Sequence, residues 1–156
     1  MIDIEIEDDR WATALPDAPA LVEAAARAAL AGAQRTGGVV ILLTDDAAQQ
    51  ALNLQFRGKD SSTNVLSFPA PENPEDHLGD ISLAYEVCAA EARDQAKPFA
   101  HHLQHLVAHG VLHLVGYDHE TDAEALEMEG LERQVLAGLG VSDPYAAERG
   151  DDGEFR

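Results

Sequence analysis

The chain has 156 residues, of which 29 are acidic and 10 are lysine or arginine, so its formal net charge is −19. Apolar residues make up 46% and charged residues 25%, proportions that fit a globular protein and exclude an acidic disordered polymer. The negative charge also argues against a protein that coats nucleic acid without specificity, because that task uses a basic surface.

Patterns along the chain predict strands and helices separated by glycine and proline. In chain order they are a strand at Ile2–Ile6, a helix at Leu21–Ala31, a strand at Val39–Leu43, a helix capped by Asp45 or Asp46 and ending near Phe56, strands at Val65–Phe68 and Leu78–Leu83, and helices at Tyr85–Gln95, Phe99–Val115 and Asp122–Leu139. We therefore expect one α+β domain over residues 1–145, with a small mixed sheet of about four strands packed by four or five helices. Residues 146–156 are expected to be an acidic, disordered tail.

Cysteine content and the first residues of the chain indicate the cellular compartment of the protein. Cys88 is the only cysteine, so no disulfide can form within the chain, and no basic segment with an apolar stretch opens the sequence. No apolar run approaches the roughly 20 residues that span a bilayer. We expect a cytoplasmic protein without membrane contact.

Five of the seven histidines fall on one predicted helix, and two of them have the spacing of metal ligands. His109 and His113 lie about 40° apart around a helix and about 6 Å apart along it. Gly116 then allows a turn, and His119 follows. Metzincin proteases share this spacing of three histidines and a turn glycine. Three nitrogen ligands without a thiolate are typical of a catalytic zinc site, so the spacing predicts a zincin-like cleft that holds one Zn²⁺.

One position departs from the protease pattern. In those proteases a glutamate follows the first histidine and serves as general base, whereas Gly110 stands there in this chain. Loss of a general base costs about 10²–10⁴-fold in rate, so peptide hydrolysis by that mechanism is not expected. A metal can still lower the pKa of its bound water toward about 7. Asp118 and Glu120 flank His119 and are candidates to orient a ligand or accept a proton, with solvated loop acids as the alternative.

Two blocks of the sequence resemble a known family. His109–Glu120 (HGVLHLVGYDHE) resembles the signature of the YbeY family of metal-dependent endoribonucleases and rRNA maturation factors. Asn53–Pro69 (NLQFRGKDSSTNVLSFP) is similar to the family's other characteristic segment, and Leu78–Ile81 matches its next strand. Three residues of the final helix also match, namely Met128, Glu129 and Glu132. Together with them, the similarity covers roughly residues 38–145.

The resemblance implies a fold, a site and partners. The fold is a small sheet packed by helices, with a zinc cleft at one side. The implied zinc ligands are His109, His113 and His119, and the arginine required for RNA processing matches Arg57. The implied activity is cleavage of single-stranded RNA in maturation of the small-subunit (16S) rRNA 3′ end and in ribosome quality control. Partners would be that rRNA and a ribosomal particle or assembly proteins, and no DNA partner is expected.

Arg57 also suits a phosphate on physical grounds. A guanidinium is always charged and donates two parallel hydrogen bonds to a phosphate, so Arg57 is the candidate to position the scissile phosphate. Lys59 can place a charge near a neighbouring phosphate. Arg57 and Lys59 are thus the candidate substrate-binding residues, and Asp118 joins Arg57 as a candidate catalytic residue. The alternative is that Arg57 and Lys59 are both ordinary solvated loop residues.

Two rival functions stay open on the sequence. One is a ribosome-assembly binding factor with a structural zinc, which needs a fourth protein ligand such as His105 or Asp118, neither at convincing spacing. The other is a metal-dependent hydrolase of a non-RNA substrate, such as an amide or ester. For RNA cleavage, water and the RNA's own 2′-hydroxyl are both candidate nucleophiles.

The acidity is unevenly distributed along the chain. Residues 1–9 carry a net −5 and residues 118–156 a net −9, whereas residues 47–71 carry +1. The acids repel most of an RNA chain, while the near-neutral stretches can hold it locally. We therefore expect RNA binding to be weak, salt-sensitive, and dependent on the metal and on docking to a ribosomal particle or partner.

Overall fold

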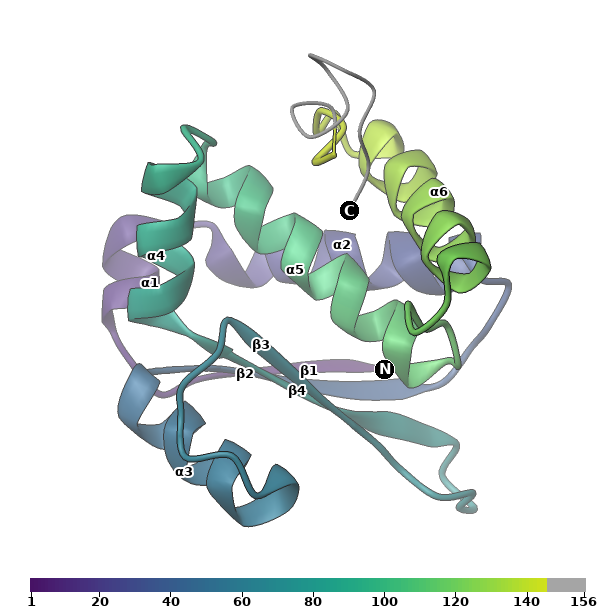
Figure 1. The fold of residues 1–156 in the computed structure, drawn as a ribbon, viewed down its shortest axis with the longest axis horizontal. Coiled ribbons are helices and arrows are strands. Elements are labelled where there is room, and N and C mark those ends of the chain that lie inside the picture. Colours follow the sequence, from purple (N-terminus) through teal and green to yellow (C-terminus); the bar gives the residue numbers. More distant parts are fainter. Residues whose placement is uncertain (146–156) are drawn as a thin grey trace.

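A four-stranded sheet with helices on both sides forms the centre of the protein (Figure 1). The computed structural model describes residues 1–145. Its elements are β1 (Ile2–Ile6), α1 (Arg10–Ala14), α2 (Ala18–Gly32), β2 (Gly38–Thr44), α3 (Asp46–Arg57), β3 (Val65–Pro69), β4 (His77–Ala84), α4 (Tyr85–Asp94), α5 (Phe99–Leu114) and α6 (Asp122–Gly138). The strand order is β1-β2-β4-β3, with β3 antiparallel at the edge and the other strands parallel. The predicted α+β fold with a small mixed sheet is confirmed.

The helices differ from the prediction in two places. The structure has six helices over residues 1–145 rather than four or five, because α1 was not predicted: it is too short to show an apolar period, and Trp11 is its one buried residue. Helix α2 begins at Ala18 instead of Leu21, since Pro19 lies in the first turn, where a missing N–H costs nothing. None of the helices in this part of the chain has both the length and the apolar character needed to cross a bilayer.

The two faces of the sheet are covered unequally. Helices α2 and α5 lie over one face together with α1, α4 and α6, and only α3 lies on the other (Figure 1). Val39, Ile41 and Leu43 of β2 point into the core beneath the helices and are buried. Val40 and Leu42 alternate with them and are half-exposed on the α3 side. The strand alternation therefore separates a packed face from an open one.

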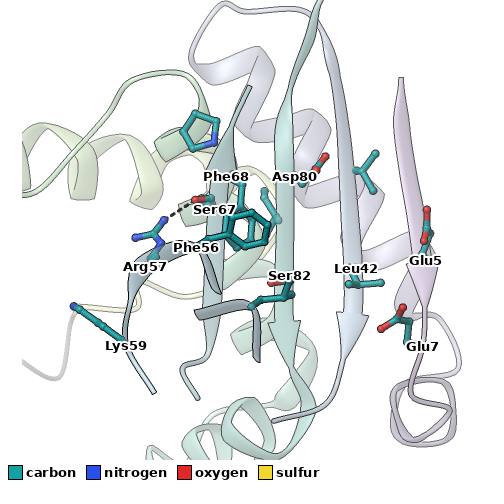
Figure 2. Close-up of a pocket in the computed structure, with 14 residues that line it drawn as sticks. Glu5, Glu7, Leu42, Phe56, Arg57, Lys59, Ser67, Phe68, Asp80 and Ser82 are labelled. Carbon is teal, nitrogen blue, oxygen red and sulfur yellow. Dashed lines mark hydrogen bonds between the residues drawn. The ribbon is translucent and has the colours of Figure 1, made fainter. Parts of the chain in front are cut away.

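Strand register aligns side chains in rows across the open face (Figure 2). One row runs over all four strands and consists of Glu5, Leu42, Ser82 and Leu66. The next row contains Val40, Asp80 and Phe68. Apolar floor residues thus alternate with polar ones, and α3 leaves part of this surface open.

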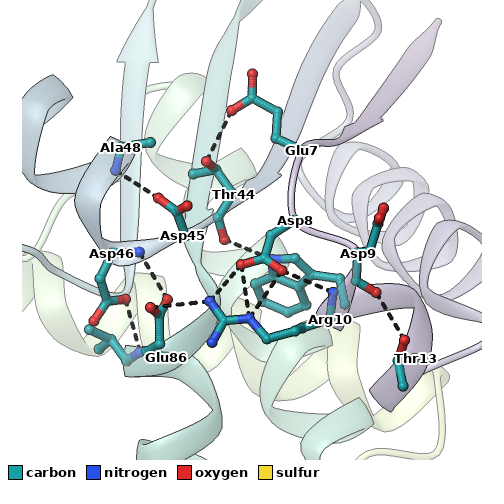
Figure 3. Close-up of polar contacts among 12 residues, drawn as sticks. Glu7, Asp8, Asp9, Arg10, Thr13, Thr44, Asp45, Asp46, Ala48 and Glu86 are labelled. Atoms are coloured by element: carbon teal, nitrogen blue, oxygen red, sulfur yellow. Dashed lines mark hydrogen bonds and ion pairs between the residues drawn. The ribbon is translucent and has the colours of Figure 1, made fainter.

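A polar network ties the starts of α1, α3 and α4 to one another (Figure 3). Arg10 forms ion pairs with Asp8 at 2.6 Å and with Glu86 at 3.1 Å. Glu86 accepts the backbone N–H of Asp46, and the Asp46 carboxylate accepts the backbone N–H of Val87. Each of these two carboxylates therefore satisfies an N–H group at the start of the other's helix.

Two glycines allow α5 and β3 to lie close to β4. A Cβ atom at Gly110 of α5 would lie 3.1 Å from Ile81 Cδ1 and 3.2 Å from Ser67 Oγ. Gly79 of β4 has a φ of +152°, and a Cβ atom there would lie 2.5 Å from the carbonyl oxygen of Phe68. A side chain at Gly79 would force β3 and β4 apart, whereas one at Gly110 would require Ile81 and Ser67 to shift slightly.

We expect Gly79→Ala to lower the free energy of unfolding by about 1–3 kcal/mol, the usual cost of forcing atoms into a packed site. The cause is a methyl group placed against a backbone carbonyl, in a conformation that L side chains rarely adopt. Gly130→Ala is the matched control, because the nearest atom to its Cβ would be 3.8 Å away. In mid-helix that change should raise stability by about 0.5–1 kcal/mol. Urea denaturation of both variants measures the difference, and equal stabilities would contradict the close approach.

Candidate metal centre

Three histidine side chains converge at the C-terminal end of α5. One ligand atom from each of His109, His113 and His119 lies within 4.8 Å of the other two. The Nε2 atoms of His109 and His113 are 3.1 Å apart, and the rings of His113 and His119 are 5.0 Å apart between centroids. Two nitrogens on one tetrahedral Zn²⁺ lie about 3.4 Å apart, given bonds of about 2.0–2.1 Å. The cluster, called the histidine triad below, can therefore hold one metal ion.

The loop after α5 brings the third histidine back to the helix. Gly116 adopts a φ of +104°, which turns the chain sharply and is favoured only by glycine. The Asp118 carboxylate then accepts the backbone N–H of His119 at 2.8 Å. Asp118 thus shapes the loop that presents His119, and it also lines the cleft beside the triad.

A buried carboxylate on α6 orients one imidazole of the triad. Glu132 Oε2 lies 2.5 Å from His109 Nδ1, and Oε1 accepts the hydroxyl of Tyr145. Burial by itself raises the pKa of Glu132, but interactions with His105 and His109 outweigh it and hold the pKa well below its usual range. We therefore assign the imidazole proton to Nδ1 of His109. Its Nε2 then directs a lone pair toward the other histidines, as a metal ligand requires.

His113 is also kept in the form that binds a metal. Burial, followed by repulsion from His109 and His119, lowers its pKa below the ordinary value for histidine. An imidazole must be neutral to coordinate a metal ion. The lowered pKa of His113 thus favours the neutral imidazole that an ion at the triad requires.

The other histidines of α5 have different partners. His105 Nε2 lies 3.3 Å from the Tyr145 hydroxyl, and burial lowers its pKa. His102 pairs with Glu91 at 2.9 Å. Neither His105 nor Asp118 belongs to the ligand cluster within residues 1–145, although both are candidate fourth ligands on the sequence.

Arg57 lines the same cleft as the triad. The triad, Asp118 and Arg57 line one cavity of about 420 Å³. Arg57 is the last residue of α3, which Gly58 ends with a left-handed φ of +70°. Its Nη2 donates to the carbonyl oxygen of Ser67 at 2.6 Å (Figure 2). Lys59 lines a neighbouring groove and not this cleft, so the structure separates it from the other predicted site residues.

Ser67 connects the two walls of the cleft. Its carbonyl oxygen accepts from Arg57, and its hydroxyl donates to the carbonyl oxygen of Gly110 at 3.2 Å. Gly110 stands where zincin proteases carry their catalytic glutamate. A Cβ atom at this position would lie 3.1 Å from Ile81 and 3.2 Å from Ser67, closer than most Cβ contacts. The packing of α5 on the sheet therefore favours glycine at this position.

Sequence patterns alone assign no role to Glu132, Tyr145 or Ser67. A signal for Glu132 is present, because it shares the buried face of α6 with Met128 and Leu136, where a charge needs a partner. Tyr145 and Ser67 carry no comparable signal, since their contacts involve residues far along the chain.

Comparison with known proteins gives one consistent result. A family model described as Endoribonuclease YbeY matches residues 3–140. Endoribonuclease YbeY of Azorhizobium caulinodans is 56% identical over 153 residues, which cover 93% of this chain and 96% of that protein. The Maricaulis maris protein of the same name is 49% identical and covers 94% of this chain and 92% of its own.

Structural comparison agrees with the sequence matches. The solution structure of a protein from Thermotoga maritima superposes with a TM-score of 0.57 at 29% identity, covering 99% of this chain and 100% of that one. The fold, the triad with Arg57, and the matches over nearly the whole chain converge, and the chain belongs to the Endoribonuclease YbeY family.

Proposed function

We propose that this protein is a zinc-dependent endoribonuclease that cleaves single-stranded RNA in the cytoplasm. Its task is maturation of the 3′ end of the small-subunit (16S) rRNA and ribosome quality control, on a ribosomal particle or with assembly proteins. The observation that carries the proposal is that the histidine triad and Arg57 line one cleft, a candidate cation site beside a candidate phosphate site. Family membership supports RNA as the substrate, because the relatives are named endoribonucleases.

The donor set favours a catalytic zinc over a structural one. Three imidazoles without a thiolate are typical of catalytic zinc sites, which keep one position for water or substrate. A structural zinc needs a fourth protein ligand, and the cluster formed by the described residues has only three members. This favours an enzyme over an assembly factor with a closed site.

The residues in and beside the cleft have separate roles in the cleavage of a phosphodiester. When bound, zinc supplies a Lewis acid that polarises a phosphoryl oxygen and lowers the pKa of water. Arg57 binds the scissile phosphate, because one of its N–H groups is held by Ser67 and the guanidinium has others to donate. Asp118, which lines the cleft beside His119, is the candidate proton acceptor. Lys59 lies beyond the cleft, where its charge suits a neighbouring phosphate.

Glu132 acts through His109 as a positioning residue. It holds the Nδ1 proton and so fixes the ring orientation and raises the basicity of Nε2. Tyr145 satisfies the second carboxylate oxygen, which keeps Glu132 in place. The carboxylate is fully buried, so water does not compete for it.

We expect His113→Ala to lose both bound zinc and RNA cleavage, because two imidazoles remain where three are needed. His101→Ala is the control on the same helix, since His101 lies outside the ligand cluster. Zinc per chain, from mass spectrometry of the metal, and cleavage of a labelled single-stranded RNA measure the two effects. A full complement of zinc in His113→Ala would show that the ligand assignment is wrong.

We expect Arg57→Ala to keep its zinc and to cleave RNA about 10²–10³-fold more slowly, the usual cost of removing one donor from a developing charge. Arg57→Lys should recover only part of the rate, because an ammonium group lacks the planar fork of the guanidinium. Arg27→Ala is the control, since Arg27 pairs with Glu23 on the surface of α2. Undiminished cleavage by Arg57→Ala would contradict the phosphate role.

We expect Glu132→Gln to weaken zinc binding by about 10- to 100-fold, the usual effect of removing the hydrogen-bond partner of a ligating histidine. Competition with a chromophoric chelator measures the affinity. Glu127→Gln, an exposed position on the same helix, is the control. Thermal unfolding of the metal-free variants separates loss of stability from loss of affinity, and unchanged affinity in Glu132→Gln would refute the positioning role.

A further inference from the structure

A second and larger cavity lies on the open face of the sheet, beside α3. It has a volume of about 1020 Å³ and is called the sheet groove below (Figure 2). Val40 and Leu42 of β2 form part of its floor, and Phe56 of α3 and Phe68 of β3 form one wall. Its mostly apolar walls and its size suit an organic ligand.

The sheet groove adjoins the metal cleft at strand β3. Arg57, Ser67 and Pro69 line both cavities. Because Nη2 of Arg57 is bonded to the Ser67 carbonyl, the guanidinium is held at the boundary between them. A phosphate bound by Arg57 would therefore place its neighbouring nucleoside at the entrance of the groove.

Two aromatic rings stand at this entrance. Phe56 is 60% exposed, which is unusual for so large an apolar side chain, and its ring centroid lies 5.5 Å from that of Phe68. The guanidinium carbon of Arg57 lies 5.9 Å from the Phe68 ring centroid. An exposed aromatic ring and a half-buried one beside a cation that can bind phosphate resemble the surfaces on which nucleic-acid-binding proteins stack single-stranded bases.

Charge limits what can enter the groove. Arg57 and Lys59 lie at its α3 end, whereas Glu5 and Glu7 project from β1 at the opposite end and Asp80 from the floor (Figure 2). The acids repel further phosphates but accept a base, which is neutral and carries N–H donors. The occupant that fits both ends is a single nucleoside whose phosphate remains at Arg57.

We propose that the sheet groove binds one nucleobase next to the scissile phosphate, stacked on Phe56 and Phe68. This inference rests on the proposed function, since it assigns the phosphate on Arg57 to an RNA substrate. The base in the groove fixes how the strand crosses β3 and therefore which phosphate reaches the histidine triad. Stacking in the groove thus adds binding affinity for RNA, and the protein backbone does not read the base sequence there.

The test combines a variant with a modified substrate. Zinc-loaded wild type, Phe56→Ala and Leu54→Ala are compared by kcat/KM on one short single-stranded RNA and on versions that lack one base at a time around the mapped cleavage site. Leu54 is the control, because it is 50% exposed on the same helix and outside the groove lining. We expect Phe56→Ala to lose about 5- to 150-fold on the intact RNA, as for one lost stack. The loss of kcat/KM in Phe56→Ala should be smaller on the RNA that lacks the base at one position next to the cleaved bond. Leu54→Ala should match wild type.

Other outcomes overturn the inference in distinguishable ways. Equal rates for Phe56→Ala and wild type on intact RNA would show that the groove does not bind a base and has another occupant, such as a protein partner. The proposed function would still stand. An equal loss on every abasic RNA would show that Phe56 does not act through a base. No cleavage of any RNA by zinc-loaded wild type would refute the proposed function itself.

Discussion

The contact between β3 and α5 at Ser67 is the interaction on which the site depends. The Ser67 hydroxyl donates to the Gly110 carbonyl on the helix that carries two histidines, and its own carbonyl accepts from Arg57. One residue thereby connects the helix that carries His109 and His113 to the side chain of Arg57. Because each contact ends on a backbone carbonyl, the positions of strand and helix fix where the two acceptors lie.

Local patterns account for much of the fold, whereas tertiary contacts account for what they miss. Alternating isoleucines predict β1, and the spacing of His109, His113 and His119 predicts the triad, because each depends on neighbouring residues alone. Helix α1 is missed since its few residues show no complete period. The Tyr145 contact with Glu132 depends on how α6 and the following segment pack against α5, which no local pattern encodes.

The unequal covering of the sheet places the packed core on one face and the sheet groove on the other. The helix-covered face holds the core and fixes the histidines through α5, while the open face carries the sheet groove. Net charge alone argues against an RNA substrate, yet Arg57 and Lys59 lie together at one end of that open face. In the proposed function, acids elsewhere oppose indiscriminate RNA binding, so discrimination depends on where a few charges lie and not on their sum.

The close approach at Gly110 has an evolutionary consequence. Proteases with the same histidine spacing differ at this position by a glutamate, which a single codon change from glycine can supply. In this fold the Cβ of such a residue would lie 3.1 Å from Ile81 and 3.2 Å from Ser67, so both side chains would have to shift slightly. A change toward the protease motif therefore involves the residues that pack on α5 as well as the motif itself.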